Sequence, residues 1–156
     1  MEHRDLIARA IALSAEGVDR VDGGPFGALV ARGGEVVAEG WNRVPSSHDP
    51  TAHAEIVAIR AAAQSLVSFS LEGCVLYCSC EPCPMCLAAS YWARIDHVYY
   101  ANTRSDAAAI GFDDQFFYDE LARPISERSL PLTRLEVDRS LVPMSEWNED
   151  PEKVRY

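Results

Sequence analysis

The sequence predicts a single-domain α/β sandwich. Three observations support this prediction: the chain has 156 residues, enough for one domain with a sizeable core; strand-like runs alternate with helical stretches of about 10–15 residues; and no repeat, linker or low-complexity segment interrupts them. Hydrophobic residues make up 48% and charged residues 24%, the balance of an ordinary globular protein.

The first half of the chain alternates helical and strand patterns. Apolar residues recur at helical spacing over residues 3–17, which predicts an opening helix. Two short apolar runs, over 26–31 and 35–41, flank a Gly-Gly turn and predict a hairpin. The alanine-rich stretch over 52–66 predicts a second helix, with Thr51 placed to cap it.

The second half repeats this alternation. Apolar and aromatic residues over 74–79 indicate a buried strand, and Pro84 suits the first turn of a helix over 84–93. The remaining elements are a strand over 97–101, a helical region over 105–121 interrupted near Gly111, a final strand over 132–137 and a helix in the last 16 or so residues.

Charge and hydropathy narrow the possible partners. The net charge is −10 and the 14 basic residues are scattered, so a polyanion such as tRNA or DNA would be repelled. A small neutral or weakly polar substrate suits this balance better. No stretch approaches the roughly 20 apolar residues of a membrane helix, and the first residues lack the apolar centre of a signal peptide. We therefore expect no nucleic-acid partner, no membrane partner and a cytoplasmic location.

All five cysteines lie within 13 residues, which indicates metal binding. A disulfide framework would spread its cysteines along the chain, and a reducing compartment would keep them as thiols. An odd number at short spacing favours a metal site instead. The five are Cys74, Cys78, Cys80, Cys83 and Cys86.

Two short motifs supply the donors for such a site. Cys83 and Cys86 stand three residues apart at a predicted helix start, where free backbone N–H groups and the helix dipole favour thiolates. His53, at the start of the other helix, supplies a third ligand. Three protein ligands leave the fourth tetrahedral position of a zinc ion for water, as in catalytic zinc sites.

Glu55 follows His53 by two residues, which in a helix interior would place them on opposite faces. Side chains of a first turn can aim past the helix end, so we expect both helices to point their N-termini at the metal. Glu55 is then a carboxylate that does not bind the metal but can take a proton from the water that zinc activates. The pairing H-x-E with P-C-x-x-C is the signature of zinc-dependent nucleobase deaminases.

Other interpretations remain open at this point. Cys80 could join His53, Cys83 and Cys86 in a closed structural zinc site, although Glu55 would then have no role beside the metal. Cys74, Cys78 and Cys80 fit buried core thiols better. His3, His48 and His97 fit surface or packing roles. A redox dithiol would leave His53 and Glu55 unexplained.

The whole chain resembles the bacterial guanine deaminases of the zinc-dependent cytidine-deaminase superfamily. The matching stretches are GGPFGA (23–28), HDPTAHAE (48–55), SCEPCPMCL (79–87), YWAR (91–94), DAAAIGFDD (106–114) and the terminal Tyr156. The resemblance implies one deaminase domain over residues 1–156, one zinc ion per chain, and a three-layer α/β/α sandwich with a five-stranded mixed sheet. It also implies a homodimer in which the C-terminal segment, about 140–156, is swapped into the partner's active site.

The same resemblance assigns the substrate contacts. Asn42, Asp114 and Tyr156 contact the purine, while Phe26 and Trp92 wall the pocket. Asp114 could accept a hydrogen bond from guanine N1–H or assist proton delivery to the leaving amine. Without the resemblance, Asp114 could be a solvated neighbour of Asp113, Phe26 and Trp92 could be core aromatics, and Asn42 could be a loop residue.

The expected activity is zinc-dependent hydrolytic deamination of guanine to xanthine and ammonia. Water activated by zinc attacks C2, and Glu55 accepts its proton and then protonates a ring nitrogen. The alternatives are a nucleoside such as guanosine, an aminotriazine such as ammeline, or a cytosine-type base. A tRNA adenosine deaminase shares the zinc motif but should carry a basic RNA-binding surface. A non-catalytic zinc-binding module would not need Glu55.

Overall fold

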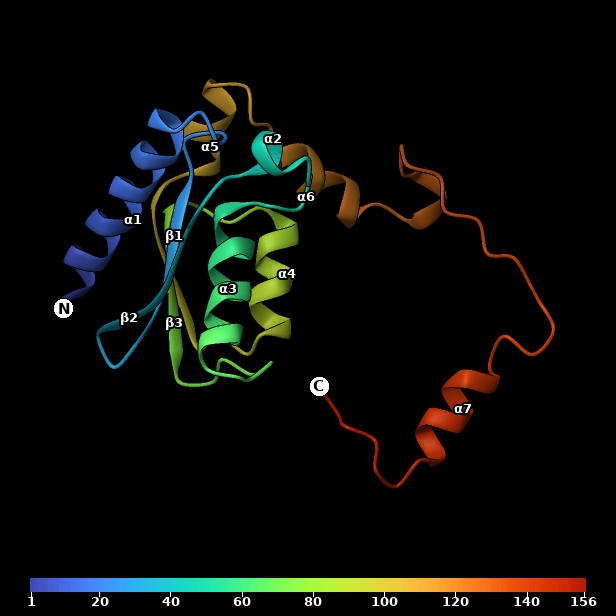
Figure 1. Cartoon of the computed structure of the whole chain (residues 1–156). Helices are drawn as coiled ribbons and strands as arrows, with labels where there is room; N and C mark the ends of the chain where they lie inside the picture. The colour runs from blue at the N-terminus through green and yellow to red at the C-terminus, as the bar shows by residue number, and fades with distance from the viewer. The chain divides into compact units, whose positions relative to one another are not determined.

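In the computed structural model, which describes residues 1–156, a four-stranded mixed sheet lies between helices on both of its faces (Figure 1). The strands follow the order β2-β1-β3-β4, with β1 antiparallel to both β2 and β3, and β3 parallel to β4. Their bounds are β1 Gly27–Arg32, β2 Glu35–Trp41, β3 Cys74–Cys80 and β4 His97–Asn102. The predicted α/β class and mixed sheet are confirmed.

One face of the sheet is covered by α1 (His3–Asp19), whose buried residues fall on a single stripe. Leu6 and Leu13 of this stripe pack against Leu29 and Tyr77 of the sheet. Burying these side chains is the main force that holds the helix in place, at about 25 cal/mol for each Å² of apolar surface removed from water.

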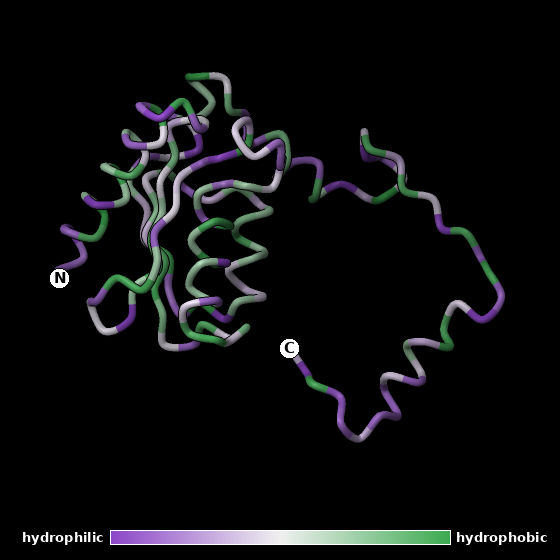
Figure 2. The backbone as a smooth tube through the Cα atoms, viewed as in Figure 1, coloured by the Kyte–Doolittle hydropathy of each residue, from purple (hydrophilic) through white to green (hydrophobic).

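The opposite face is covered by α3 (Ala54–Ser65), with α4 (Pro84–Trp92) beside it. Figure 2 shows that these two helices are largely hydrophobic. The side of α3 that faces the sheet consists of alanines, Ala54, Ala58 and Ala62, each fully buried. Small side chains let the helix approach the strands closely, so its first residues are held firmly over one end of the sheet.

Two glycines in the strands permit this close packing from opposite faces. A Cβ on Gly27 would collide with the backbone of α1, and a Cβ on Gly40 would collide with the backbone of α3 at Ala54 and Ala58. Backbone clashes of this kind cannot be relieved by a side-chain rotation, so we expect any larger residue to displace a helix.

In the chain, the remaining helices lie between β2 and α3 or after β4. Thr103 caps α5 (Arg104–Ala109) through a reciprocal capping box with Asp106. The chain then turns at Gly111, whose φ of +94° favours glycine, before α6 (Asp114–Ala122) begins. The predicted interruption near Gly111 is therefore confirmed. The short α2 spans Val44–Ser47.

The chain divides into two units, Met1–Tyr118 and Asp119–Tyr156. The second unit contains the 3-10 helix η1 (Ile125–Glu127) and α7 (Val142–Glu149), and it buries none of its side chains. It therefore has no hydrophobic core of its own. None of the helices in the structure has the length and apolar character needed to cross a bilayer.

Two expectations about local structure are wrong. The sheet has four strands, not five, because residues 132–137 do not form a strand. Their apolar residues Leu132, Leu135 and Val137 suit a strand, but a strand also needs a neighbour, and the second unit contains no other strand. Thr51 does not cap α3: the N-cap is His53, and the Thr51 hydroxyl donates to Asp49 instead.

Candidate active site

The possible metal donors lie where the first turns of two helices meet. His53 is the N-cap of α3 and Cys83 is the N-cap of α4, while Cys86 lies one turn into α4. The ligand atoms of these three residues lie within 4.8 Å of one another, and His53 Nδ1 is 3.6 Å from Cys83 Sγ. One metal ion could therefore be held by all three.

The loop before His53 is shaped by a tight network. Asp49 Oδ1 accepts hydrogen bonds from the backbone N–H and the hydroxyl of Thr51, at 2.8 and 2.7 Å. The carbonyl of Ala52 accepts from the backbone N–H of Arg43 at 2.9 Å. These bonds tie the loop to the end of β2, so His53 enters α3 in a defined position.

The pKa values of the two cysteines are shifted in opposite directions. A hydrogen bond from Cys86 and the neighbouring His53 lower the pKa of the Cys83 thiol to about 4, against the opposing effect of burial. The same hydrogen bond, together with burial, raises the pKa of Cys86. The lowered pKa favours the thiolate form of Cys83, which is the form that binds a metal cation. Two sulfurs and one imidazole are a donor set that suits zinc.

Glu55 lies in the first turn of α3 and is buried. Its Oε2 accepts a hydrogen bond from Cys86 Sγ at 3.4 Å. Burial is the largest cause that raises the pKa of Glu55, to about 7, with the charge of Cys83 acting in the same direction. A carboxyl group with this pKa can both accept and release a proton near neutral pH.

The remaining cysteines do not belong to the donor cluster. Cys74, Cys78 and Cys80 are buried free thiols, as expected of core cysteines. Cys80 Sγ donates to the carbonyl of Thr103 at 3.5 Å. The structure therefore does not form a closed site with four protein ligands, and the cluster leaves the fourth tetrahedral position of a zinc ion without a protein ligand.

The histidines outside the cluster have other partners. His3 Nδ1 makes a hydrogen bond with Tyr77 Oη at 2.7 Å, and its ring lies 4.5 Å from that of Tyr99. His97 packs on the other side of Tyr99, with ring centroids 4.3 Å apart. His48 ends α2 in the left-handed conformation. All three therefore have packing or loop positions.

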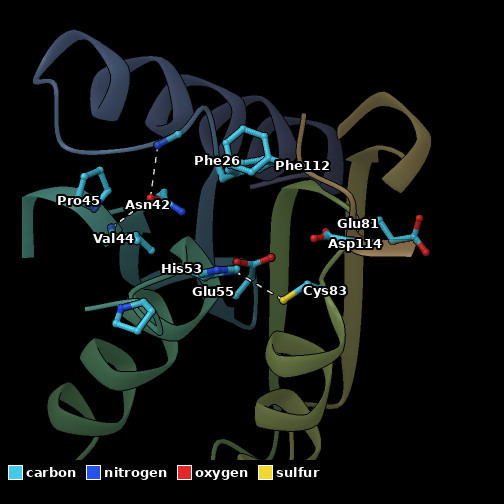
Figure 3. A pocket seen from close by; sticks show the side chains of 12 residues that line it. Phe26, Asn42, Val44, Pro45, His53, Glu55, Glu81, Cys83, Phe112 and Asp114 are labelled. Atoms are coloured by element: carbon cyan, nitrogen blue, oxygen red, sulfur yellow. Dashed lines mark hydrogen bonds between the residues drawn. The ribbon is translucent and has the colours of Figure 1, made fainter. Parts of the chain in front are cut away.

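A pocket of about 250 Å³ opens beside the donor cluster (Figure 3). Two aromatic rings stand at its rim, Phe26 and Phe112, edge to face with centroids 4.8 Å apart. A flat apolar wall beside polar groups is typical of a site for a heteroaromatic ring. The lining residues are Gly24, Phe26, Asn42, Val44, Pro45, Pro50, His53, Glu55, Glu81, Cys83, Phe112 and Asp114.

Asn42 is a buried pocket residue with a defined orientation. Its Oδ1 accepts the backbone N–H groups of Gly24 and Val44, at 3.4 and 3.2 Å. Because the oxygen is occupied by two backbone donors, the amide nitrogen is the atom left to donate to a ligand. A Cβ on Gly23 would overlap the Asn42 side chain, so the adjacent glycine makes this arrangement possible.

The two adjacent aspartates take different positions. Asp114, the first residue of α6, lines the pocket, and burial raises the pKa of its carboxyl group. Asp113 is exposed, and its Oδ1 accepts from the backbone N–H of Phe116. Only one of the pair therefore faces the pocket.

Of the two remaining expected residues, Trp92 lies at the opposite end of α4 from the cysteines and Tyr156 lies in the second unit. Trp92 is the last residue of α4, whereas the cysteines lie at its start, and Trp92 is 68% exposed. It is not among the lining residues. Tyr156 belongs to the second unit and is 71% exposed. Phe26, Asn42 and Asp114, in contrast, all line the pocket.

Comparison with known proteins identifies the family. Residues 1–102 match the model of the cytidine and deoxycytidylate deaminase zinc-binding region. The chain belongs to this deaminase family. The match spans both motifs that carry the donor cluster, so the chain contains a zinc-binding deaminase region, and His53, Cys83 and Cys86 are a group within it that could hold the ion.

Several members of the deaminase family are similar over much of the chain. Guanine deaminase of Bacillus subtilis (strain 168) is 47% identical over 156 residues, covering 100% of both chains. Its X-ray structure matches with a TM-score of 0.97 over 100% of this chain and 99% of that chain. The protein NE0047, solved in complex with 2,6-diaminopurine, is 32% identical, with a TM-score of 0.68 over 72% of this chain and 63% of that chain.

A second branch of the deaminase family acts on RNA. The tRNA-specific adenosine deaminase of Aquifex aeolicus (strain VF5) is 43% identical over 77 residues, which cover 49% of this chain and 51% of that protein. The match with the Bacillus subtilis enzyme, in contrast, continues through the C-terminal residues.

Sequence reasoning missed several pocket residues of this deaminase. Phe112 and Glu81 are the most informative, because each lies inside a stretch that carries the resemblance: Phe112 directly precedes the Asp113–Asp114 pair, and Glu81 precedes Pro82 and Cys83. Their positions relative to the motifs were the available signal. The other missed residues are Gly24, Val44, Pro45 and Pro50.

Proposed function

We propose that this protein catalyses the zinc-dependent hydrolytic deamination of guanine: guanine and water react to form xanthine and ammonia. The observation that carries the proposal is the match to guanine deaminase of Bacillus subtilis, 47% identical over the full length of both chains. The pocket supports it, because an aromatic wall, a carboxylate and an amide donor lie beside the donor cluster.

His53, Cys83 and Cys86 are the residues that would hold the zinc ion. When bound, zinc lowers the pKa of a water molecule so that it can act as a nucleophile near neutral pH. The cluster is suited to this role because it leaves one tetrahedral position free of protein ligands. The N-termini of α3 and α4 both meet at the cluster, and their dipoles stabilise negative charge there.

Glu55 is the proton carrier. Its buried carboxylate lies next to the donors, and burial keeps its pKa near the pH at which it must both accept and release a proton. Glu55 takes the proton of the attacking water and delivers it to a ring nitrogen as the C2–oxygen bond forms. The remaining proton of the water, now on the C2 hydroxyl, then passes to the amine as the C2–amine bond breaks, so that ammonia leaves and the C2 carbonyl of xanthine forms.

Asp114 and Asn42 recognise the base. Guanine offers an N1–H donor and an O6 acceptor, so its pocket needs a carboxylate as well as donors. Asp114 supplies the carboxylate and can accept from N1–H or assist proton delivery to the leaving amine. The Asn42 amide supplies a donor, and Phe26 provides an apolar face for the ring.

The second unit takes part through a partner subunit. The functional form is a homodimer in which the segment from about residue 140 to 156 of one chain reaches the pocket of the other, with Tyr156 contacting the purine. This exchange is supported by the exposed apolar side chains of the segment, which lack a core of their own: Leu141, Met144, Trp147 and Val154. Trp92 is exposed and does not line the pocket of its own chain, so it can form part of a pocket wall only where the dimer brings it to the pocket of the partner chain.

The reaction takes place in the cytoplasm on a free base. All five cysteines are unpaired, which suits a reducing compartment. With a net charge of −10, binding of tRNA or single-stranded DNA should be undetectable at physiological salt. A gel shift with tRNA at micromolar protein would favour the adenosine-deaminase branch instead.

The direct test is ammonia release from a panel of substrates by the zinc-loaded protein: guanine, guanosine, ammeline, cytosine and adenine. We expect guanine to give the highest kcat/KM. Faster turnover of guanosine or ammeline would identify that compound, and not guanine, as the substrate. Release of ammonia from none of these compounds by the zinc-loaded protein would favour a non-catalytic zinc-binding module.

A further inference from the structure

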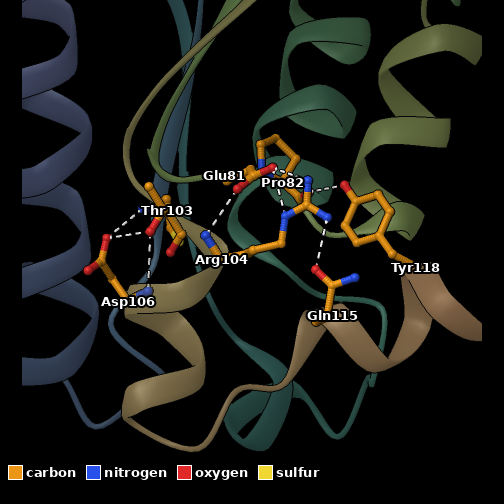
Figure 4. A network of polar contacts seen from close by, with 8 residues as sticks. Glu81, Pro82, Thr103, Arg104, Asp106, Gln115 and Tyr118 are labelled. Carbon is orange, nitrogen blue, oxygen red and sulfur yellow. Dashed lines mark hydrogen bonds and ion pairs between the residues drawn. The ribbon is translucent and has the colours of Figure 1, made fainter.

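Arg104 connects the metal loop to the helix that carries Asp114. Arg104 is the first residue of α5, and its guanidinium group donates to Glu81 Oε1 through Nε and Nη2, at 3.0 and 2.7 Å. The Arg104 backbone N–H donates to the other oxygen, Glu81 Oε2, at 3.0 Å. Glu81 lies two residues before Cys83, so these three bonds anchor the loop that leads to the metal donors (Figure 4).

The same guanidinium group also contacts two side chains of α6. Its carbon lies 4.1 Å from the ring centroid of Tyr118, and Nη1 donates to Gln115 Oε1 at 3.4 Å. Tyr118 in turn donates its hydroxyl to the carbonyl of Pro82 at 2.9 Å, directly before Cys83. Figure 4 shows Arg104 between the Glu81–Pro82 loop and the two α6 side chains.

We infer that Arg104 is a positioning residue that holds the first turns of α6 against the Cys83 loop and thereby aims the Asp114 carboxylate into the pocket. The inference rests on the proposed role of Asp114 in guanine deamination. Asp114 begins α6 directly after the Gly111–Asp113 turn. It has no hydrogen bond to the metal loop among the described contacts, whereas Gln115 and Tyr118 on the same helix are attached to that loop, directly or through Arg104.

An arginine suits this position better than a lysine. The planar guanidinium group can bind a carboxylate along one edge and stack its face on an aromatic ring at the same time, which a point-charged ammonium cannot do. The carboxylate partner is largely shielded, since the Glu81 side chain is 15% exposed. Removing the guanidinium group therefore leaves both the loop and α6 without their common partner.

The metal donors themselves are held by other contacts. The Cys83 carbonyl accepts from the Leu87 backbone N–H within α4, and the Glu81 backbone N–H donates to the Asn102 carbonyl at the end of β4. Neither bond uses the Arg104 side chain. Loss of Arg104 should therefore displace Asp114 while leaving zinc bound, which separates a positioning role from a role in metal binding.

The test compares Arg104→Gln, Arg104→Lys and Asp114→Asn, singly and combined, with guanine as substrate. Arg104→Gln should lower kcat by about 10–100-fold, the usual range for residues that support a site from its second layer. KM should change much less, and zinc should stay at about one per chain. In the Asp114→Asn protein, the further loss from Arg104→Gln should be within about twofold, because the two residues act through one carboxylate. Arg104→Lys should restore only part of kcat.

Amide hydrogen exchange supplies a readout that does not depend on turnover. In Arg104→Gln, exchange should rise at residues 114–118 and stay unchanged in α3. Arg32→Gln is the matched control: it removes an exposed arginine at the end of β1 that donates to the Glu72 carbonyl and does not line the pocket, and it should leave kcat unchanged. If Arg104→Gln does not fold, Tyr118→Phe tests the same connection by removing only the hydroxyl bond to Pro82.

The outcomes distinguish this inference from the proposed function. Wild-type kcat in Arg104→Gln, loss of zinc, or an equal fold-loss in the Asp114→Asn protein would each overturn the positioning role. If Asp114→Asn itself keeps wild-type kcat, the proposed role of Asp114 fails first, and the inference fails with it. If guanine is not turned over by the wild-type protein, the substrate assignment is what fails.

Discussion

His53 and Cys83 occupy equivalent positions on different helices. Each is an N-cap with extended backbone angles, φ −66° and ψ 155° for His53, φ −67° and ψ 167° for Cys83, and His53 Nδ1 lies 3.6 Å from Cys83 Sγ. An N-cap side chain projects past the end of its helix, so both residues reach the same space. Glu55, in the first turn of α3, can therefore lie beside the donors although it follows His53 by only two residues.

Zinc binding should depend on the three donor residues and on no other cysteine. We expect about one zinc per chain in the wild-type protein, and loss of that zinc in a Cys83→Ala, Cys86→Ala double variant. Cys80→Ser is the control, because Cys80 is buried near the site but outside the donor cluster. Metal analysis of the purified proteins checks this. Zinc retained by the double variant, or lost from Cys80→Ser, would contradict the ligand set.

Replacing Glu55 should separate catalysis from metal binding. Glu55→Gln keeps the shape of the side chain but removes the proton carrier, so guanine turnover should fall by at least about 10²–10⁴-fold. Zinc content and thermal unfolding should stay close to those of the wild type. Steady-state ammonia release, measured beside metal analysis, checks both. Near-normal turnover would mean that another group carries the proton.

The adjacent aspartates provide a matched pair of variants. Asp114→Asn should lower kcat strongly, because its carboxylate lines the pocket, whereas Asp113→Asn should have little effect on kcat. The two changes remove the same charge one residue apart, so a general effect of net charge would lower both equally. Kinetics with guanine decide between these outcomes, and equal losses would remove the specific role of Asp114.

Deleting the last few residues, including Tyr156, should cut guanine turnover severely and leave zinc content nearly unchanged. Chain ends are usually frayed unless something ties them down, and closing a purine beneath the tail would also exclude water from the reacting centre. Turnover by the truncated chain is the measurement. Normal turnover would remove Tyr156 from the site.

Mixing two inactive chains tests whether the tail is exchanged. A truncated chain and a Glu55→Gln chain each carry one defect. If tails cross, one site of the mixed dimer combines an intact Glu55 with the partner's intact tail, and activity partly returns. If each tail serves its own chain, every site keeps one defect and no activity returns. The chains must be unfolded and refolded together so that mixed dimers form.

Lowering the pH should remove the stabilising effect of an ion pair that joins α1 to β2. Arg9 donates to both carboxylate oxygens of Glu39, at 2.7 Å each, and this pair of bonds holds the pKa of Glu39 below its ordinary value. A depressed pKa stabilises the fold above the unfolded-state pKa of about 4.5, and this contribution is lost as the pH falls through the folded-state value.

Glu39→Gln should therefore lower the free energy of unfolding by about 0.5–1 kcal/mol at pH 7, since the pair is partly exposed. The difference from the wild type should shrink as the pH falls below about 4.5. Denaturant unfolding of both proteins at several pH values measures it. Glu35→Gln, exposed at the start of the same strand, is the control. A difference that stays constant with pH would contradict the ionic origin.

The residues alone determined the elements and the chemistry of the site. Apolar residues three or four positions apart indicate helices and short apolar runs indicate strands, so α1, α3 and the four strands could be predicted within a few residues. The donors could be predicted because His53 and Glu55, and likewise Cys83 and Cys86, are neighbours in the chain, and N-terminal helix positions explain how they converge. The prediction of the zinc site therefore rested on the local spacing of residues within each motif.

Only the tertiary structure decided which distant residues join that site. Arg104 meets Glu81, Tyr118 meets Pro82 and Phe112 meets the pocket because the chain after β4 returns to the residues that follow β3, a contact that no local pattern encodes. The predicted strand over 132–137 shows the converse. Its apolar residues suit a strand, but a strand forms only where another strand offers its backbone, and that partner is decided by the fold and not by the segment itself.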